Sequence, residues 1–367
     1  MKVPFVDLKL QYQNYKAEID KAIADVIADT AFIGGSGNKY VQKFESEFAK
    51  YLGIANVISC ANGTDSLEIL LEAYGITEGE EVIVPALSWI SSSEAVGRCG
   101  AKPVFVDVCE DTLLMDLNLV EKAITKNTKA IMPVHLYGNA LNMEEVMRIA
   151  KKHNLIVIED CAQAHGAKYN GKLVGTFGHA SSFSFYPGKN LGAYGDAGAI
   201  ATNDETIAKK CRMIANHGQQ RKHDHIIEGR NSRMDGLHAA ILSVKLNYLD
   251  GWNLARNKAA SHYSKILDST NVSLPIQNKN AYHVFHLYVI RSNKRDQLKE
   301  HLSSQGIEVA IHYPTALPFL NAYSYLKHQP EQFPVAFKQT KNILSIPMYP
   351  ELNVEQIDHI SKVINNF

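Results

Sequence analysis

The chain has 367 residues, of which 46% are hydrophobic and 21% are charged. These values are typical of globular proteins and argue against disorder, and the length suggests two domains, or one large domain with a lobe. Lysine plus arginine and aspartate plus glutamate balance at 38 each. Without a net positive field, we expect no nucleic-acid partner and no binding to an anionic membrane.

The cellular setting is predicted from the cysteines and the N-terminal residues. The five cysteines are scattered and never form a C-x-x-C pair, which favours reduced thiols over a disulfide framework or a zinc site. The first residues, M-K-V-P-F-V-D-L, lack the apolar core of a signal peptide, and no apolar window is long enough to cross a bilayer. We therefore expect a soluble, cytoplasmic protein.

The first part of the chain has the pattern of an α/β domain. Apolar residues recur at helical spacing within residues 19–27 and 41–52, which predicts two helices with core-facing stripes. Seven short apolar runs then alternate with helical patterns, at residues 56–60, 81–84, 104–106, 130–134, 155–159, 182–185 and 198–202. Because strands buried on both faces are apolar along their length, we predict a mostly parallel seven-stranded sheet covered by helices. Ligands of such sheets gather at the carboxyl ends of the strands.

The last part of the chain changes character after a long helical region at residues 234–267. A strand at 283–290, a helix at 294–305, a strand at 307–312 and a closing helix at 354–364 together predict a small α+β lobe. We therefore predict a large domain over residues 1–247 and a smaller C-terminal domain over residues 248–367.

The most informative stretch lies between residues 158 and 198, which contains I-E-D-C-A-Q-A-H-G and S-S-F-S-F-Y-P-G-K-N-L-G-A-Y-G-D-A-G. Asp160 ends an apolar run, and Lys189 lies in a loop rich in glycine and aromatic residues. A pyridoxal 5′-phosphate (PLP) enzyme needs a lysine for its Schiff base and a carboxylate beside the protonated ring nitrogen. Ser184 supplies a hydroxyl for the phosphate. The alternative, a strand-end acid and an unrelated surface lysine, is disfavoured because Gln163 and Ser184 also fit.

A second phosphate contact is predicted at Asn62-Gly63-Thr64, between the first strand and a helix that begins near Asp65. Glycine permits close approach, and the N-terminus of a helix offers free N–H groups. Helix capping alone is the alternative interpretation. Ser184 as a second donor favours the phosphate site.

These motifs resemble the DegT-type (DegT/DnrJ) nucleotide-sugar aminotransferases, which have the aspartate-aminotransferase (type I) fold of PLP enzymes. The resemblance extends over nearly the whole chain. Supporting motifs are V-P-F-V-D-L from residue 3, F-E-S-E-F-A-K-Y-L-G from 44, A-N-G-T-D-S-L from 61, P-V-H-L-Y-G from 133, G-R-N-S-R-M-D from 229 and H-Y-P from 312. The resemblance implies PLP on Lys189, with Asp160 at the ring nitrogen and Gly63, Thr64 and Ser184 at the phosphate.

The resemblance also assigns residues around the cofactor ring. Trp89 matches the aromatic residue that stacks on the ring, and Gln163 matches the glutamine near its phenolic oxygen. Asn231 matches a loop residue that contacts the phosphate in the neighbouring subunit, so a homodimer with shared active sites is expected. A core tryptophan and a polar loop before a helix are the respective alternatives for Trp89 and Asn231.

Three residues are expected on the substrate side. His312 and Tyr313 match a substrate-facing loop of the small domain. Because the chain has no net charge, the diphosphate of a sugar nucleotide must be met by local cations, and Arg233 is the best motif-borne candidate. The alternative is that Arg233 forms a salt bridge or packs on the helix after it.

We expect no metal site. His283 and His286 are three positions apart on a predicted strand, so their side chains should face opposite sides. His223 and His225, on either side of Asp224, belong to a polar loop that is better explained by solvation.

The resemblance implies transfer of an amino group from L-glutamate to a keto group of a dTDP- or UDP-linked deoxy-sugar. Such products feed O-antigen (lipopolysaccharide) or other surface glycans and glycosylated natural products. The alternatives are a sugar dehydratase of the same fold, a PLP enzyme acting only on amino acids, and a non-catalytic regulatory protein. Lys189 argues against the dehydratase, where the family has histidine. The position of the ketone, the nucleotide base and the face that receives the amine stay open.

Overall fold

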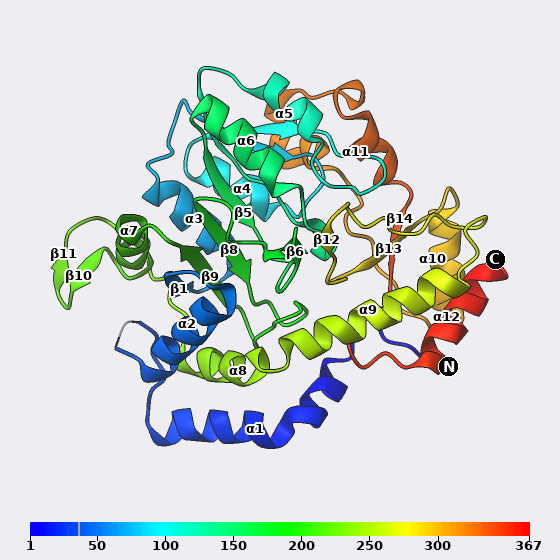
Figure 1. Cartoon of the computed structure of the whole chain (residues 1–367), viewed down its shortest axis with the longest axis horizontal. Helices are drawn as coiled ribbons and strands as arrows, with labels where there is room; N and C mark the ends of the chain where they lie inside the picture. The colour runs from blue at the N-terminus through cyan, green and yellow to red at the C-terminus, as the bar shows by residue number, and fades with distance from the viewer. Residues whose placement is uncertain (36) are drawn as a thin grey trace.

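The computed structural model describes residues 1–35 and 37–367, and its centre is a seven-stranded sheet (Figure 1). The strands lie in the order β1-β9-β8-β5-β4-β2-β3. They are β1 (Asn56–Cys60), β2 (Glu81–Pro85), β3 (Lys102–Val106), β4 (Thr128–Ile131), β5 (Ile156–Asp160), β8 (Ala180–Ser184) and β9 (Gly198–Thr202). Of these strands, β9 alone runs antiparallel to its neighbours, β1 and β8. The predicted mostly parallel α/β sheet is confirmed.

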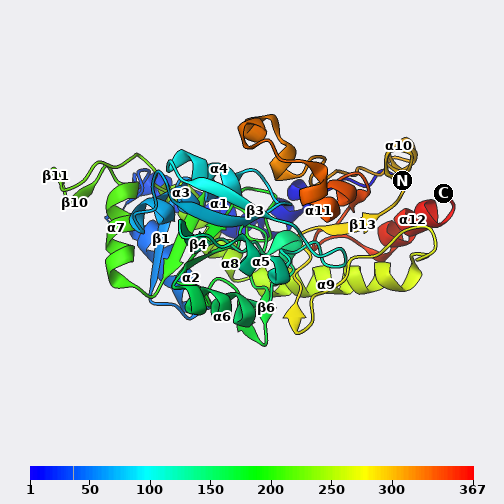
Figure 2. The ribbon, with the colours of Figure 1, turned by 90° about the horizontal axis from the view of Figure 1, so that it is seen from above.

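Helices cover the sheet, and Figure 2 shows α3 and α4 on one side with α6 on the other. The helices of this part are α1 (Leu8–Ala28), α2 (Lys39–Leu52), α3 (Gly63–Ala73), α4 (Ser91–Arg98), α5 (Leu117–Ala123), α6 (Met143–His153), α7 (Glu205–Ala215) and α8 (Gly236–Leu246). The predicted stripe of α2 is buried as expected. The stripe of α1 is narrower than predicted, because Ile19 and Val26 are buried but Ile27 is 53% exposed.

The C-terminal part contains α9 (Leu249–Ile266) and the antiparallel pair β13 (Tyr288–Arg291) and β14 (Ile343–Ile346), with α10 (Arg295–Ser304), α11 (Pro334–Gln339) and α12 (Val354–Asn365). The remaining strands are short and lie between the elements already named: β6 (Lys168–Tyr169), β7 (Lys172–Leu173), β10 (Gln219–Arg221), β11 (Asp224–His225) and β12 (Ala281–Tyr282). The boundary proposed after residue 247 falls between α8 and α9 and stays a prediction.

Two predicted strands of this part are wrong in extent. The strand expected at 283–290 begins only at Tyr288, because Phe285 has a left-handed φ of 42° that is incompatible with a continuous strand. The strand expected at 307–312 is reduced to single bridges, from Ile307 to Val3 and from Ala310 to Ser345. His283 and His286 therefore lie in a connecting segment, so the predicted alternation of their side chains does not apply.

Candidate active site

A cavity of about 880 Å³ opens at the carboxyl ends of β5 and β8 and at the N-terminus of α3. Segments distant in the sequence form its wall, from Phe5 near the N-terminus to Met348 after β14. The predicted site residues that border it are Gly63, Thr64, Trp89, Asp160, Gln163, Ser184, Lys189, His312 and Tyr313. The two others, Asn231 and Arg233, lie elsewhere in the chain.

Asp160 ends β5 with its carboxylate almost fully buried, at 5% exposure. The Ser92 hydroxyl donates to one carboxylate oxygen at 2.8 Å, and the Ala162 N–H donates to the other at 3.1 Å. Both hydrogen-bond donors are neutral. A buried carboxylate held only by neutral donors is suited to receive a cationic N–H group, which the protonated ring nitrogen of PLP would supply.

Lys189 is half-buried in the loop after β8, where its backbone N–H donates to the Tyr186 carbonyl at 2.8 Å. Burial lowers the pKa of the Lys189 amine from 10.5 to about 8, and the nearby Asp160 carboxylate opposes this by favouring the charged form. An amine with a pKa near 8 is partly unprotonated at neutral pH. It can therefore act as a nucleophile and as a proton carrier.

The N-terminus of α3 forms the phosphate end of the cavity. Asn62 caps the helix by accepting from the Asp65 N–H at 2.8 Å. The N–H groups of Gly63 and Thr64 belong to the first turn and have no partner within the helix. The Thr64 and Ser91 hydroxyls are 2.7 Å apart. A side chain on Gly63 would place its Cβ 2.6 Å from the Cβ of Ser184, so only glycine permits this approach. The hydroxyls and helix N–H groups fit a phosphate.

The ring end of the cavity combines an amide with aromatic side chains. Gln163 accepts from the Tyr137 N–H at 2.6 Å and donates to the Tyr313 hydroxyl at 3.0 Å. The Tyr313 ring lies 5.4 Å from that of Trp89, tilted by 44°, and Trp89 is 56% exposed. Trp89 therefore borders the cavity instead of filling the core. Its stacking on the cofactor stays a prediction.

His312 also borders the cavity. Its ring stacks on Phe5 with centroids 5.6 Å apart, and its Nδ1 lies 2.8 Å from the Ser345 hydroxyl. Burial lowers the pKa of His312 to about 4, with Lys189 acting in the same direction. His312 therefore offers a neutral imidazole to a ligand at physiological pH.

Asn231 and Arg233 contact each other and not the cavity of their own chain. The Arg233 Nε donates to Asn231 Oδ1 at 3.0 Å, and its Nη1 lies 3.4 Å from Asn216 Oδ1. Asn231 is exposed and forms a single bridge with Asn216. The hydrogen bonds of Arg233 go to these two asparagines. The neighbouring Arg230 forms salt bridges, with Glu68 and Glu72 on α3.

Several cavity residues are not predicted from the sequence. Among them are Phe5, Ser92, Tyr186, Asp196 and His286. The serine run at residues 91–93, so soon after the proline that ends β2, is the available signal for Ser92. His286 has none, because its neighbours carry the apolar pattern of a strand.

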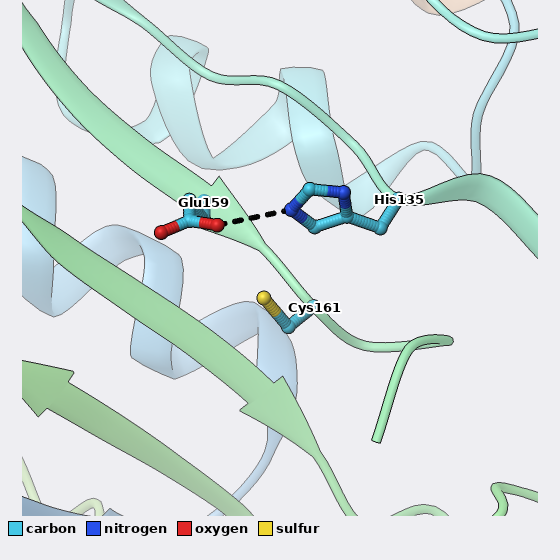
Figure 3. Close-up of side chains that lie close together, drawn as sticks. All are labelled: His135, Glu159 and Cys161. Atoms are coloured by element: carbon cyan, nitrogen blue, oxygen red, sulfur yellow. Dashed lines mark hydrogen bonds and ion pairs between the residues drawn. The ribbon is translucent and has the colours of Figure 1, made fainter. Parts of the chain in front are cut away.

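His135, Glu159 and Cys161 form a buried group behind the cavity, drawn in Figure 3. The Leu141 N–H donates to His135 Nδ1 at 3.1 Å, so the proton lies on Nε2, which donates to Glu159 at 3.1 Å. Glu159 also accepts three backbone N–H groups, from residues 175, 177 and 178, at 2.7–2.8 Å. Because its oxygens are already satisfied, this group stabilises the end of β5 and is not suited to bind a metal.

Comparison with known proteins identifies the family. The sequence model of the DegT/DnrJ/EryC1/StrS aminotransferase family matches residues 13–365. The chain belongs to this family. Its cofactor is PLP, as for the family.

Within the described residues, none of the helices has the length and apolar composition needed to cross a bilayer.

The relatives carry different names. A "Pleiotropic regulatory protein" of Geobacillus stearothermophilus is 45% identical over 100% of this chain and 99% of its own. A "dTDP-3-amino-3,6-dideoxy-alpha-D-galactopyranose transaminase" of Aneurinibacillus thermoaerophilus is 42% identical, with 100% and 99% covered.

Two solved structures are similar over the whole chain. DesV of Streptomyces venezuelae, solved in complex with a ketimine intermediate, has a TM-score of 0.96 at 38% identity, with 100% of this chain and 98% of that chain covered. NtdA of Bacillus subtilis, solved with its cofactor PMP bound, has a TM-score of 0.91 at 31% identity, with 100% and 85% covered.

Proposed function

We propose that this aminotransferase moves the amino group of L-glutamate to a keto group of a dTDP- or UDP-linked deoxy-sugar. The observation that carries the proposal is that Lys189 and Asp160 border one large cavity. The pKa of the lysine amine is lowered to about 8, and the carboxylate is held by neutral donors. Transaminases of nucleotide-linked sugars are among the relatives at about the same level of similarity.

The residues would divide the work as follows. The N-terminus of α3, Thr64 and Ser184 would hold the phosphate of PLP, and Asp160 would keep its ring nitrogen protonated. When bound, PLP supplies an electron sink for the bond changes at the α-carbon. Lys189 would carry the cofactor at rest and, once released, its amine would move a proton to and from the reacting carbon.

The size of the cavity supports a substrate larger than an amino acid. A volume of about 880 Å³ exceeds what PLP and glutamate together require at the ring end.

Among the cavity-lining residues that the structure describes, Lys189 is the only lysine or arginine. The diphosphate of a sugar nucleotide therefore needs cations from outside this wall, which agrees with a contribution by Arg233 of a second subunit.

We propose a homodimer with shared active sites. Asn231 and Arg233 lie off the cavity of their own chain, and β10 and β11, which precede them, project from the body of the molecule (Figures 1 and 2). Trp89 and Tyr186 are 56% and 58% exposed on the cavity wall, as expected where a partner covers them. We also propose that the enzyme works in the cytoplasm, in the synthesis of O-antigen, other surface glycans or glycosylated natural products.

The dimer is tested by complementation. One subunit with Lys189→Ala and another with Asn231→Ala should regain activity on mixing, because a mixed dimer holds one site without either change. Full activity of a monomer at working concentration would contradict the shared site.

The activity is tested with a panel of dTDP- and UDP-keto sugars. The enzyme and L-glutamate should aminate at least one, identified by mass spectrometry, and Lys189→Ala should abolish turnover while keeping PLP. Amination of keto acids alone would instead identify an amino-acid transaminase.

A regulatory role is the second candidate, because the relative at 45% identity is named a regulatory protein. The absorbance of the PLP-loaded protein separates the two. A competent enzyme converts its cofactor to the pyridoxamine form when L-glutamate is added, whereas a binding protein leaves the spectrum unchanged.

A further inference from the structure

We propose that His286 presents an unprotonated Nε2 to the cavity, and that this atom accepts a hydrogen bond from a hydroxyl group of the acceptor sugar. The inference deepens the proposed function and rests on it. His286 borders the cavity together with Lys189 and lies in the segment between β12 and β13. No sequence motif points to it.

A chain of buried amides fixes the position of the proton on His286. The chain is anchored on two backbone carbonyls, which can only accept. Asn253 Nδ2 donates to the His165 carbonyl at 2.8 Å, so its Oδ1 is left to accept from Asn190 Nδ2, also at 2.8 Å. Asn190 Nδ2 donates in addition to the Val284 carbonyl at 3.1 Å.

The polarity of the chain leaves one arrangement at its end. Asn190 Oδ1 lies 3.2 Å from His286 Nδ1 and can only accept, so Nδ1 must carry the proton. Turning either amide over would place its oxygen against a carbonyl oxygen. Asn253 and Asn190 are 1% and 3% exposed, so solvent does not offer replacement partners. Nε2 is therefore left with its lone pair.

The surroundings keep the ring neutral. Burial lowers the pKa of His286 well below its usual 6.5, and Lys189, Arg256, His312 and His165 act in the same direction. Arg256 also donates to the His286 carbonyl at 3.3 Å. With cations and other histidines around it, His286 stays an uncharged acceptor through the neutral range.

Because Nε2 is a hydrogen-bond acceptor, it favours the sugar over glutamate as its partner. Once its amine is engaged at the cofactor, glutamate presents only carboxylates, which are acceptors and are repelled by a lone pair, whereas a sugar presents hydroxyl groups that donate. Leu287 and Met348 border the cavity with His286, and Arg256 donates to the Met348 carbonyl at 2.8 Å. A ligand without the donor would leave this lone pair unpaired, so the hydrogen bond discriminates against it.

The proton position is tested without any substrate. Neutron diffraction of the perdeuterated, PLP-loaded enzyme should show deuterium on Nδ1 of His286 and none on Nε2. Deuterium on Nε2 would overturn the proposal.

The hydrogen bond is tested with keto-sugar nucleotides that lack one ring hydroxyl at a time. With the wild-type enzyme, one analogue should lose about ten- to hundredfold in kcat/KM, which corresponds to about 1.4–2.7 kcal/mol. His286→Phe should show the same loss with the full substrate and no further loss with that analogue. The glutamate half-reaction, followed by absorbance, should stay within about twofold.

His283→Phe is the matched control, because His283 is also buried, lies three residues away and does not border this cavity. It should leave both half-reactions unchanged. If every deoxy analogue reacts as well as the full substrate, the proposal fails while the proposed function stands. If His286→Phe slows both half-reactions equally, His286 serves the fold or the cofactor. If no keto sugar is aminated at all, the proposed function fails instead. The analogue series needs only the wild-type enzyme, so a variant that does not fold leaves the test intact.

Discussion

Lys245 gives a quantitative test of how the loop after Lys189 is held. It lies on α8, is 1% exposed, and donates to the Gly192 carbonyl in that loop at 2.5 Å. Its ammonium lies 5.0 Å and 5.8 Å from the ring centres of Tyr194 and Trp252. A buried ammonium held by one carbonyl and two rings carries a large desolvation cost.

The cost can be worked out from the ionisation of Lys245. Burial lowers its pKa from 10.5 to about 8, with Glu351 acting in the opposite direction. This difference corresponds to about 3 kcal/mol of destabilisation at neutral pH. Because the unfolded chain binds more protons between pH 8 and 10.5, the stability of the wild type rises with pH over that window.

Lys245→Met removes this dependence while keeping the length of the side chain. The difference in unfolding free energy between wild type and variant should move in favour of the wild type by about 2.5 kcal/mol between pH 7 and pH 10. Urea denaturation of the PLP-free proteins, followed by circular dichroism, measures it. Other titrating groups cancel in the subtraction.

Lys210→Met is the matched control. Lys210 also donates to a backbone carbonyl, that of Ala73 at 2.8 Å, but it is only partly buried. Its replacement controls for the loss of a hydrogen bond from a lysine to a backbone carbonyl. A difference for Lys245→Met that stays constant within about 0.5 kcal/mol would refute the assignment of a desolvated cation.

Three further predictions concern the cofactor and the substrate. Asp160→Asn should lower kcat by several orders of magnitude with little loss of stability, because an amide cannot hold the ring proton; a loss below about tenfold, or about 1.4 kcal/mol, would show that Asp160 is not the ring partner. Gly63→Ala should weaken PLP binding at least about tenfold, measured by fluorescence titration, since the new methyl group would lie 2.6 Å from Ser184 Cβ; unchanged affinity would place the phosphate elsewhere. Arg233→Ala should raise KM for the sugar nucleotide and spare the glutamate half-reaction, and an equal fall in both would assign Arg233 to the cofactor or the fold.

The sheet and the residues at its strand ends are predictable from the sequence because both depend on local patterns. Runs of apolar residues mark the seven strands, and Asp160 and Gly63 are placed by the strands that precede them. Because ligands of parallel sheets bind at the carboxyl ends of the strands, the pattern alone indicates that these two residues share one site.

The amide chain behind His286 is not predictable in this way. Asn190 bonds to residues 63, 94 and 96 positions away, and nothing in the local sequence distinguishes it from a neutral loop residue. The left-handed backbone at Phe285 also has no local signal, so the apolar pattern around it favours a strand that does not form. Asn231 and Arg233 do not border the cavity of their own chain, and the shared site proposed for them would need a second subunit, which a pattern within one chain does not reveal.

The two consecutive carboxylates at the end of β5 have opposite consequences for handling the enzyme. Glu159 is fully hydrogen-bonded by donors that belong to the protein, whereas Asp160 has only two neutral donors and is free to receive the ring nitrogen proposed for the cofactor. Removal of the cofactor therefore takes a hydrogen-bond donor from Asp160 and leaves the hydrogen bonds of Glu159 unchanged. The empty enzyme should keep its pocket in shape during purification and regain activity on simple addition of PLP, without a refolding step.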